Sequence, residues 1–369
     1  MTMNLSTYRT LFPVTDKSVY LNNAAESPLN NRVRQKLEEY LQLAAEEPQN
    51  KPEVRTIIRQ KLSEIFGGTV DEYALVTSTG MGISMVACGY QWQKGDNIVL
   101  PIDEHWNNTF PWLALQERGV EVRLVPIGED QRVDADKIAG MVDKNTRILS
   151  TAAVRFNSGF RADLRLLSDI AHDKGALLMV DGIQGAGVIP MNVIDDGIDI
   201  LACAGFKWLL GMPGTGFLYV NANVQESIRP VLPGMFSAEN NSRELNYLPD
   251  ARRYETGTIA YSLFHAWAAG LEILQEIGIS NIHSHVLGLT DRIIAGMRAK
   301  NIEIVTPVEK ASDRSAIISF TMGSETANKE CYNRLRENNV IVALRGGQIR
   351  VSPNFFNTEE EIELLLQLL

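Results

Sequence analysis

The stretch that decides the fold is VDGIQGAGVIPMNVIDDGIDILACAGFKWLLG, residues 180 to 211. Asp181 follows the apolar run ALLMV, and Lys207 lies between Phe206 and Trp208. A carboxylate at the end of a buried strand needs a cationic or hydrogen-bonded partner that offsets its desolvation. A desolvated amine has a lowered pKa and can form a Schiff base with an aldehyde. Taken alone, Lys207 has a simpler interpretation, in which its stem packs on the aromatic neighbours and its amine reaches water.

Pyridoxal phosphate (PLP) would explain both residues together. In PLP chemistry an acidic residue keeps the pyridine nitrogen protonated, so that the ring accepts electrons from the substrate carbanion. A lysine holds the aldehyde carbon of the same ring. The pair of Asp181 and Lys207 therefore predicts a PLP cofactor.

The overall composition excludes several classes of function. The chain has 369 residues and a formal net charge of −10, with no block of Lys or Arg, which argues against a nucleic-acid partner. Its three cysteines, Cys88, Cys203 and Cys331, form no CxxC pair, so we expect no metal and no disulfide framework. The N-terminus lacks the pattern of a signal peptide, and no apolar run reaches membrane-spanning length. We expect a soluble cytoplasmic protein with no membrane partner.

Short apolar runs alternate with helical patterns through the middle of the chain, which predicts an α/β fold with a mostly parallel sheet. Helix-like segments such as WNNTFPWLALQERG and LRLLSDIAHDKG lie between several of these runs. After about residue 250 two long helical patterns and three short strands predict a smaller α+β domain. The six central runs are DNIVLP (96–101), VEVRLVPI (120–127), TRILSTAAV (146–154), GALLMVDG (175–182), IDILACA (198–204) and TGFLYVN (215–221).

Ligands of open parallel sheets bind beyond the carboxyl ends of the strands. His105, Arg155, Asp181 and Lys207 all follow apolar runs. We therefore expect these four side chains to lie near one site.

Seven segments of the chain resemble the class V aminotransferase family of fold-type I PLP enzymes, which includes cysteine desulfurases and isopenicillin N epimerase-like proteins. The resemblance implies a large PLP-binding domain (16–250) with a seven-stranded type of sheet, a small C-terminal domain (251–369), and an N-terminal segment (1–15) that packs on the small domain. The segments are YLNNAAESPLN, TSTGMGIS, DEHWNNTFPW, RFNSGFRADL, LMVDGIQGAG with AGFKWLLGMPGTGFLYV, RYETGTIAY and GGQIRVSPNFFNTEEEI.

The resemblance assigns roles around the cofactor ring. Lys207 would form the Schiff base and move the Cα proton, Asp181 would pair with the pyridine nitrogen, and Gln184 would bond the phenolic oxygen. His105 matches the aromatic residue that stacks on the ring, although a histidine in a surface loop is a competing interpretation.

Other positions match phosphate and substrate contacts of the family. Thr79, Gly80 and Met81 would offer N–H groups at a helix start, with an ordinary helix cap as the alternative. Thr258 matches a residue that reaches the phosphate in the neighbouring subunit, which predicts a homodimer with a shared site. Three residues match the substrate side: Arg350 would bind the α-carboxylate, with an exposed strand arginine as the alternative, and Asn23 and Arg155 border the site.

The sequence also departs from the desulfurase pattern. Ala204 and Phe206 replace polar contacts before the lysine, and Phe156 stands where an asparagine usually contacts the cofactor oxygen, a task open to Arg155 or Asn157. The segment ENNVIVALRGGQIRVSP lacks the nucleophilic cysteine of the desulfurases.

Three functions remain open from the sequence. The first is a PLP enzyme that acts at Cα of an amino acid through an external aldimine, as a class V aminotransferase. The second is a PLP-dependent C–S lyase without the persulfide cysteine. The third is a catalytically inactive scaffold with a PLP-enzyme fold.

Overall fold

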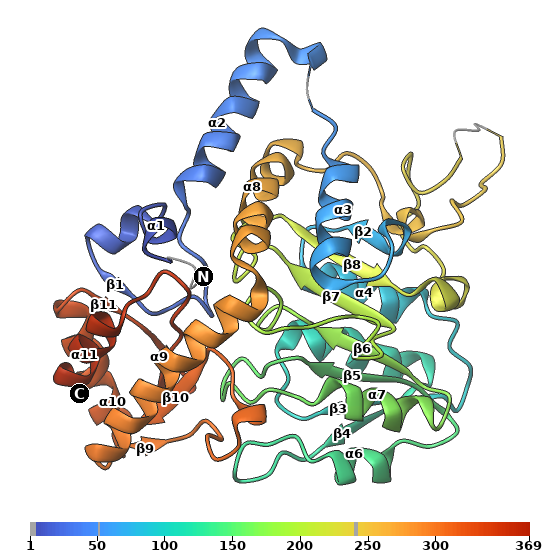
Figure 1. Ribbon diagram of the computed structural model, residues 1–369. Helices are drawn as coiled ribbons and strands as arrows, with labels where there is room; N and C mark the ends of the chain where they lie inside the picture. The colour runs from blue at the N-terminus through green and yellow to red at the C-terminus, as the bar shows by residue number, and fades with distance from the viewer. Residues whose placement is uncertain (1–4, 51, 240–242) are drawn as a thin grey trace.

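A sheet of seven strands forms the centre of the computed structural model, which describes residues 5–50, 52–239 and 243–369 (Figure 1). Among them only β8 runs antiparallel to its neighbours, β2 and β7, so the predicted mostly parallel sheet is confirmed. In spatial order the strands are β2 (Tyr73–Leu75), β8 (Gly216–Val220), β7 (Ile200–Ala204), β6 (Leu177–Asp181), β5 (Thr146–Ala152), β3 (Asn97–Pro101) and β4 (Glu121–Val125).

Six of the seven strands lie in the six apolar runs of the sequence, and β2 is too short to give a comparable signal. Both faces of the sheet are covered by helices. Alternate residues of a strand point to opposite faces, so each strand contributes to two hydrophobic clusters. In β6, Leu178 and Val180 join one hydrophobic cluster, and Met179 joins the other. The first cluster includes residues of α3 (Arg55–Phe66), α6 (Ala135–Met141) and α7 (Leu164–His172); the second includes residues of α4 (Thr79–Gly89).

The segment WNNTFPWLALQERG is not the single helix that its pattern indicates. It divides into η4 (Trp106–Asn108), α5 (Phe110–Leu113) and η5 (Ala114–Arg118). Pro111 has no N–H group, so one continuous α-helical ladder through this segment is interrupted.

The C-terminal region forms the predicted second, smaller unit of sheet and helices, at the lower left of Figure 1. Its antiparallel sheet has the order β12 (Ala343–Arg345), β13 (Gln348–Val351), β10 (Ile318–Thr321) and β9 (Glu303–Ile304). Its helices are α9 (Ile279–Ala299), α10 (Glu325–Glu337) and α11 (Glu359–Leu368), and Cys331 of α10 is buried in its core.

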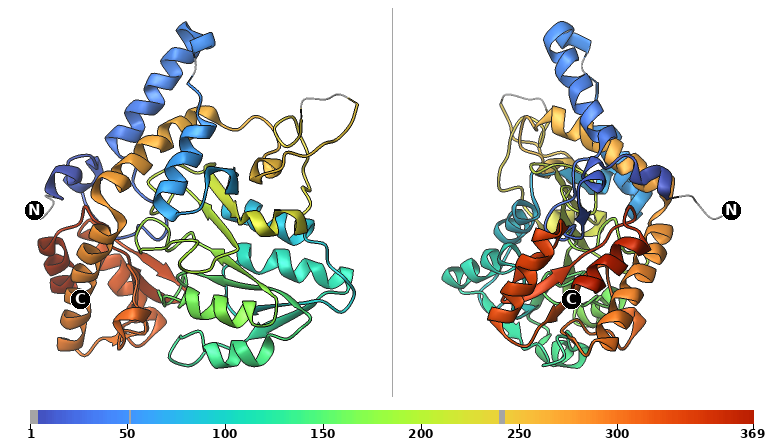
Figure 2. Two further views of the ribbon diagram at one scale, coloured as in Figure 1. Left: turned by 45° about the vertical axis from the view of Figure 1, so that its right-hand side comes forward. Right: turned by 90° about the vertical axis from the view of Figure 1, so that its left-hand side faces the viewer.

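The N-terminal segment lies against the C-terminal region, as both views of Figure 2 show. Arg9 of α1 (Ser6–Arg9) donates to the carbonyl of Phe356 and pairs with Glu361, and Phe12 stacks on Phe356 at 4.1 Å. The pairing of β1 (Val19–Tyr20) with β11 (Val340–Ile341) continues this contact. Residues 1–4 of the expected N-terminal segment lie outside the described residues.

The boundary at residue 250 stays a prediction. Helix α8 (Tyr261–Ile277), which follows it, packs on α2 (Asn31–Glu46) and α3, and its buried Trp267 belongs to the same cluster as the central strands. No helix within the described ranges combines the length and apolar character needed to cross a membrane. The remaining short 3-10 helices are η1 (Pro13–Asp16), η2 (Pro48–Asn50), η3 (Val70–Glu72), η6 (Ala222–Ser227), η7 (Ala251–Tyr254) and η8 (Ala311–Asp313).

Candidate active site

Side chains that follow five strands of the large sheet line one cavity of about 90 Å³. All five run in the same direction, since β2 and β7 are both antiparallel to β8, so their carboxyl ends meet at one edge of the sheet. An adjoining outer cavity of about 430 Å³ shares Ser78 and Asn107 with the first. Five residues predicted from the sequence line the inner cavity: Thr79, His105, Asp181, Gln184 and Lys207.

Asp181 and Lys207 belong to neighbouring strand ends, because Asp181 is in register with Ala202 of β7. Burial raises the pKa of Asp181 to about 6, against the opposing effects of a hydrogen bond from the Ile183 N–H and of Lys207. Burial likewise lowers the pKa of Lys207 to about 8, and Asp181 opposes that shift. Neither Asp181 Oδ2 nor Lys207 Nζ has a hydrogen-bond partner within the described ranges.

Helix α4 begins at the cavity. The Ser78 hydroxyl caps it by accepting the Met81 N–H at 3.1 Å, so this N–H is already satisfied. The N–H groups of Thr79 and Gly80 have no such bond to any described residue. Thr79 Oγ1 accepts the N–H of Ala204 at 2.9 Å, which ties the helix start to β7 and leaves the hydroxyl proton available. This helix start therefore offers unpaired donors to an anion.

His105 and Phe156 form an aromatic wall of the cavity. Their rings meet edge to face with centroids 5.3 Å apart. Burial, then the charges of Lys207 and Arg345, lower the pKa of His105, and its Nδ1 accepts the N–H of Asn107.

Glu104 and Arg155 form a buried ion pair, and Glu104 is a lining residue that the sequence reasoning missed. Arg155 Nη1 lies 3.9 Å from Glu104 Oε1, which also accepts the N–H of Ala152. Burial raises the pKa of Glu104 to about 7, with Arg155 opposing the shift. His105 is predicted because ligands bind beyond the carboxyl ends of parallel strands, and the same reasoning applies to its neighbour Glu104.

Arg155 and Asn157, the two residues expected to contact the cofactor oxygen in place of Phe156, do not line the inner cavity. Arg155 donates to the carbonyls of Ile102 and Asp103, and Asn157 Oδ1 accepts the N–H of Ser158. Phe156 itself lines the cavity.

Arg350 lies beside the cavity rather than among its lining residues. Its Nη1 donates to the carbonyl of Phe156 at 2.6 Å, while Nε and Nη2 are buried without a partner among the described residues. Burial, then the charge of Arg345, lower the pKa of Arg350 to about 10. Two unpaired donors of one buried guanidinium are suited to a carboxylate.

Hydrogen bonds on both sides of residues 23 and 24 link Gln184 to the small domain. Gln184 Oε1 accepts the Trp208 indole N–H, and its Nε2 donates to the carbonyl of Ala24. The neighbouring Asn23 donates through Nδ2 to the carbonyl of Ser352, two residues beyond Arg350. Asn23 Oδ1 is buried without a partner within the described ranges.

Three further predicted residues, Gly80, Met81 and Thr258, also lie outside the inner cavity. Gly80 and Met81 line the outer cavity, where a Cβ on Gly80 would meet the Asn107 side chain at 3.0 Å. Thr258 is exposed and lines neither cavity.

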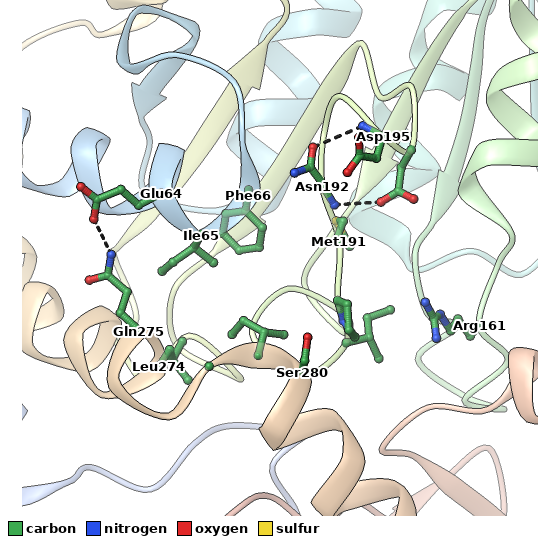
Figure 3. A pocket seen from close by; sticks show the side chains of 15 residues that line it. Glu64, Ile65, Phe66, Arg161, Met191, Asn192, Asp195, Leu274, Gln275 and Ser280 are labelled. Carbon is green, nitrogen blue, oxygen red and sulfur yellow. Dashed lines mark hydrogen bonds between the residues drawn. The ribbon is translucent and has the colours of Figure 1, made fainter. Parts of the chain in front are cut away.

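A larger cavity, of about 710 Å³, lies between α3, the loop 189–196 and the junction of α8 and α9 (Figure 3). Polar groups there bond to one another: Gln275 donates to Glu64 at 2.6 Å, and Asn192 Oδ1 accepts the N–H of Asp195. No lysine and none of the predicted site residues is among the described residues that line it. The strand-end cavity is therefore the candidate active site.

The unpaired groups of the strand-end cavity fit PLP. The buried carboxylate of Asp181 suits a ring cation, the desolvated amine of Lys207 suits an aldehyde, and the free N–H groups at the start of α4 suit a phosphate. The fold and this site define a PLP-dependent enzyme of fold type I.

Comparison with known proteins gives the family. The sequence model described as "Aminotransferase class-V" matches residues 19–365, so the chain belongs to the class V aminotransferase family. A probable cysteine desulfurase of Methanothermobacter thermautotrophicus is 32% identical over 328 residues, covering 83% of this chain and 80% of the relative. The uncharacterized aminotransferase YcbU of Bacillus subtilis is 28% identical over 358 residues, covering 96% and 94%.

The fold agrees with solved structures. A C-DES mutant with glycine covalently linked to its PLP cofactor superposes with a TM-score of 0.90 at 21% identity, covering 97% of this chain and 98% of that one. The expected fold class is thereby confirmed.

Proposed function

We propose that this PLP-dependent enzyme is an aminotransferase that acts at Cα of an amino acid. The observation that carries the proposal is the buried pair of Asp181 and Lys207 at neighbouring strand ends. Bound PLP supplies an electron-accepting ring that makes removal of the Cα proton possible. Lys207, whose pKa is lowered by burial, would bind the aldehyde carbon and, once the substrate amine displaces it from that carbon, would move the Cα proton.

The other site residues hold the cofactor and the substrate. Asp181 would keep the ring nitrogen protonated, while Gln184 would bond the ring oxygen and His105 would pack on the ring. Thr79 and Gly80, with Met81 beside them, would hold the phosphate at the start of α4. Three residues act on the substrate side: Arg350 binds the α-carboxylate, supported by its two unpaired buried donors, while Asn23 and Arg155 border the site.

A C–S lyase is the second candidate, because β-elimination needs only loss of the Cα proton and a leaving group. Persulfide formation is disfavoured, since none of the three cysteines lines either cavity. Burial raises the pKa of the Cys203 thiol well above its ordinary value, and burial also raises that of Cys331.

One assay separates these functions. The purified holoenzyme is incubated with amino acids, with and without a 2-oxo acid acceptor, and keto acid, ammonia and sulfide are measured together. Product that depends on the acceptor supports transamination, whereas pyruvate, ammonia and sulfide from cysteine without an acceptor support the lyase. A protein that binds no PLP and leaves no mass adduct on Lys207 after borohydride would be the scaffold, and the proposal would be wrong.

We further propose a cytoplasmic homodimer whose interface completes the outer cavity, with Thr258 reaching the partner's phosphate. Trp106 and Phe110 line this cavity with 65% and 61% of their surface exposed, and Met235 is 74% exposed. Such apolar exposure is typical of an interface. Light scattering should give twice the chain mass, and Phe110→Glu should lower it, unlike the control Leu166→Glu on α7.

A further inference from the structure

The hairpin of β12 and β13 brings a second arginine to the face that carries Arg350. In its register Ala343 pairs with Arg350, and Arg345 pairs with Gln348. Directly paired residues of an antiparallel hairpin share a face, as do alternate residues of one strand. Arg345 therefore projects from the same face of the hairpin as Arg350.

The turn of this hairpin fixes that arrangement. Only Gly346 and Gly347 connect the two strands, with φ values of 55° and 77°. Two successive residues in the left-handed region give the tight turn that matches the twist of a hairpin and sets its register. The spacing between Arg345 and Arg350 along the face is therefore determined by the backbone.

Arg345 has no ion pair or hydrogen bond to any other described residue, and its side chain is exposed. Its charge nevertheless acts on three groups of the site. After burial it is the second cause that lowers the pKa of Arg350, and it contributes to the lowered pKa of His105 and of Lys207. The Arg345 guanidinium thus lies within electrostatic reach of these three groups, although it lines neither cavity.

Most charged groups of the site already have a partner or an assigned role, and the cofactor phosphate is assigned to the start of α4. Arg350 is matched by the α-carboxylate of an amino acid, and Lys207 is committed to the cofactor aldehyde. The two buried carboxylates are also committed, since Glu104 faces Arg155 and Asp181 is assigned to the ring nitrogen. One positive charge, that of Arg345, remains unmatched by any described side chain at the site.

We propose that Arg345 binds a second anionic group on the substrate side chain, so that the enzyme prefers acidic amino acids to their neutral amides. This inference rests on the proposed function, because it takes Arg350 as the α-carboxylate site. A planar guanidinium donates two parallel hydrogen bonds to a carboxylate.

The test uses two isosteric pairs, aspartate with asparagine and glutamate with glutamine, added to the holoenzyme. Dissociation constants come from the change in the visible absorbance of bound PLP, which needs no turnover. At low salt we expect the preferred acid to bind roughly tenfold more tightly than its amide. Arg345→Gln should bring this ratio to within about twofold of one, and Arg345→Lys should keep part of it.

The control is Arg298→Gln, which removes the same charge from α9, where Arg298 pairs with Glu309 at the surface. It should keep the wild-type ratio. The inference is overturned if amino acids bind but acids and amides bind equally well, or if Arg345→Gln keeps the preference. If no amino acid changes the absorbance of the holoenzyme, that result would instead contradict the proposed function itself.

Discussion

The strand ends of the large sheet and the hairpin of the small domain contribute to the candidate active site in different ways. Asp181 and Lys207 are held by neighbouring strands, and burial shifts both of their pKa values toward the neutral forms. Arg345 and Arg350 extend from a hairpin, where Arg345 is exposed to solvent and Arg350 is buried. Desolvated groups on a rigid sheet suit bond making and proton transfer, whereas long cationic side chains suit recognition. Substitutions at the strand ends should therefore affect the chemical step, and those in the hairpin should affect substrate binding.

Lys207→Ala should have the largest effect. Without the amine there is neither a covalent link to the cofactor nor a group that moves the Cα proton, so we expect a loss in kcat of roughly 10⁴-fold or more. Turnover and mass spectrometry after borohydride treatment measure the two consequences. Lys174→Ala, at an exposed lysine, is the matched control. A Lys207→Ala enzyme with near wild-type turnover would show that the amine is not required.

Asp181→Asn should have the second-largest effect on turnover. The side chain keeps its size but loses the charge that holds a ring cation, so kcat should fall roughly 10²- to 10³-fold and PLP should bind more weakly. Titration of the apoprotein with PLP gives the affinity, and initial rates give kcat. Asp173→Asn changes an exposed carboxylate in the same domain and should leave both unchanged. Activity within threefold of the wild type at position 181 would exclude the assigned role.

Arg350→Gln should act mainly on KM, which separates the hairpin from the strand ends. Loss of charged hydrogen bonds worth about 1.5–3 kcal/mol predicts a rise in KM of roughly 10- to 150-fold, with a smaller effect on kcat. The bond from Arg350 to the Phe156 carbonyl is also lost, so thermal unfolding is measured in parallel. If kcat falls and KM stays constant, Arg350 does not bind the ground-state carboxylate.

The sequence predicts the strand-end half of the site better than the hairpin half. Six apolar runs mark six strands, and parallel strand ends meet at one edge, so Asp181, Lys207 and His105 line one cavity. Arg155, the fourth side chain expected there, does not line it and pairs with Glu104 instead. Glu104 follows the same rule and was overlooked beside His105. Arg345 could not be found in this way, because its position depends on hairpin register and on packing between distant segments. Thr258 stays a prediction, since its assigned contact lies in a partner subunit.

The pH dependence of PLP incorporation tests the strand-end half and the hairpin half of the site together. The folded-state pKa of Lys207 lies at about 8, below its ordinary 10.5, so the amine is charged below pH 8 and neutral above it. Because the neutral amine attacks the aldehyde, PLP incorporation into the apoprotein should accelerate about tenfold per pH unit below pH 8 and then level off. Stopped-flow absorbance measures this rate.

Two substitutions should move this inflection in opposite directions. The Asp181 carboxylate raises the pKa of Lys207 and the Arg345 guanidinium lowers it. Asp181→Asn should therefore shift the inflection to lower pH, and Arg345→Gln should shift it to higher pH by a smaller amount, because Arg345 is exposed and screened. Arg298→Gln should leave it in place. Shifts in the same direction, or an inflection near 10.5 in the wild type, would mean that burial and these two charges do not control the Lys207 amine.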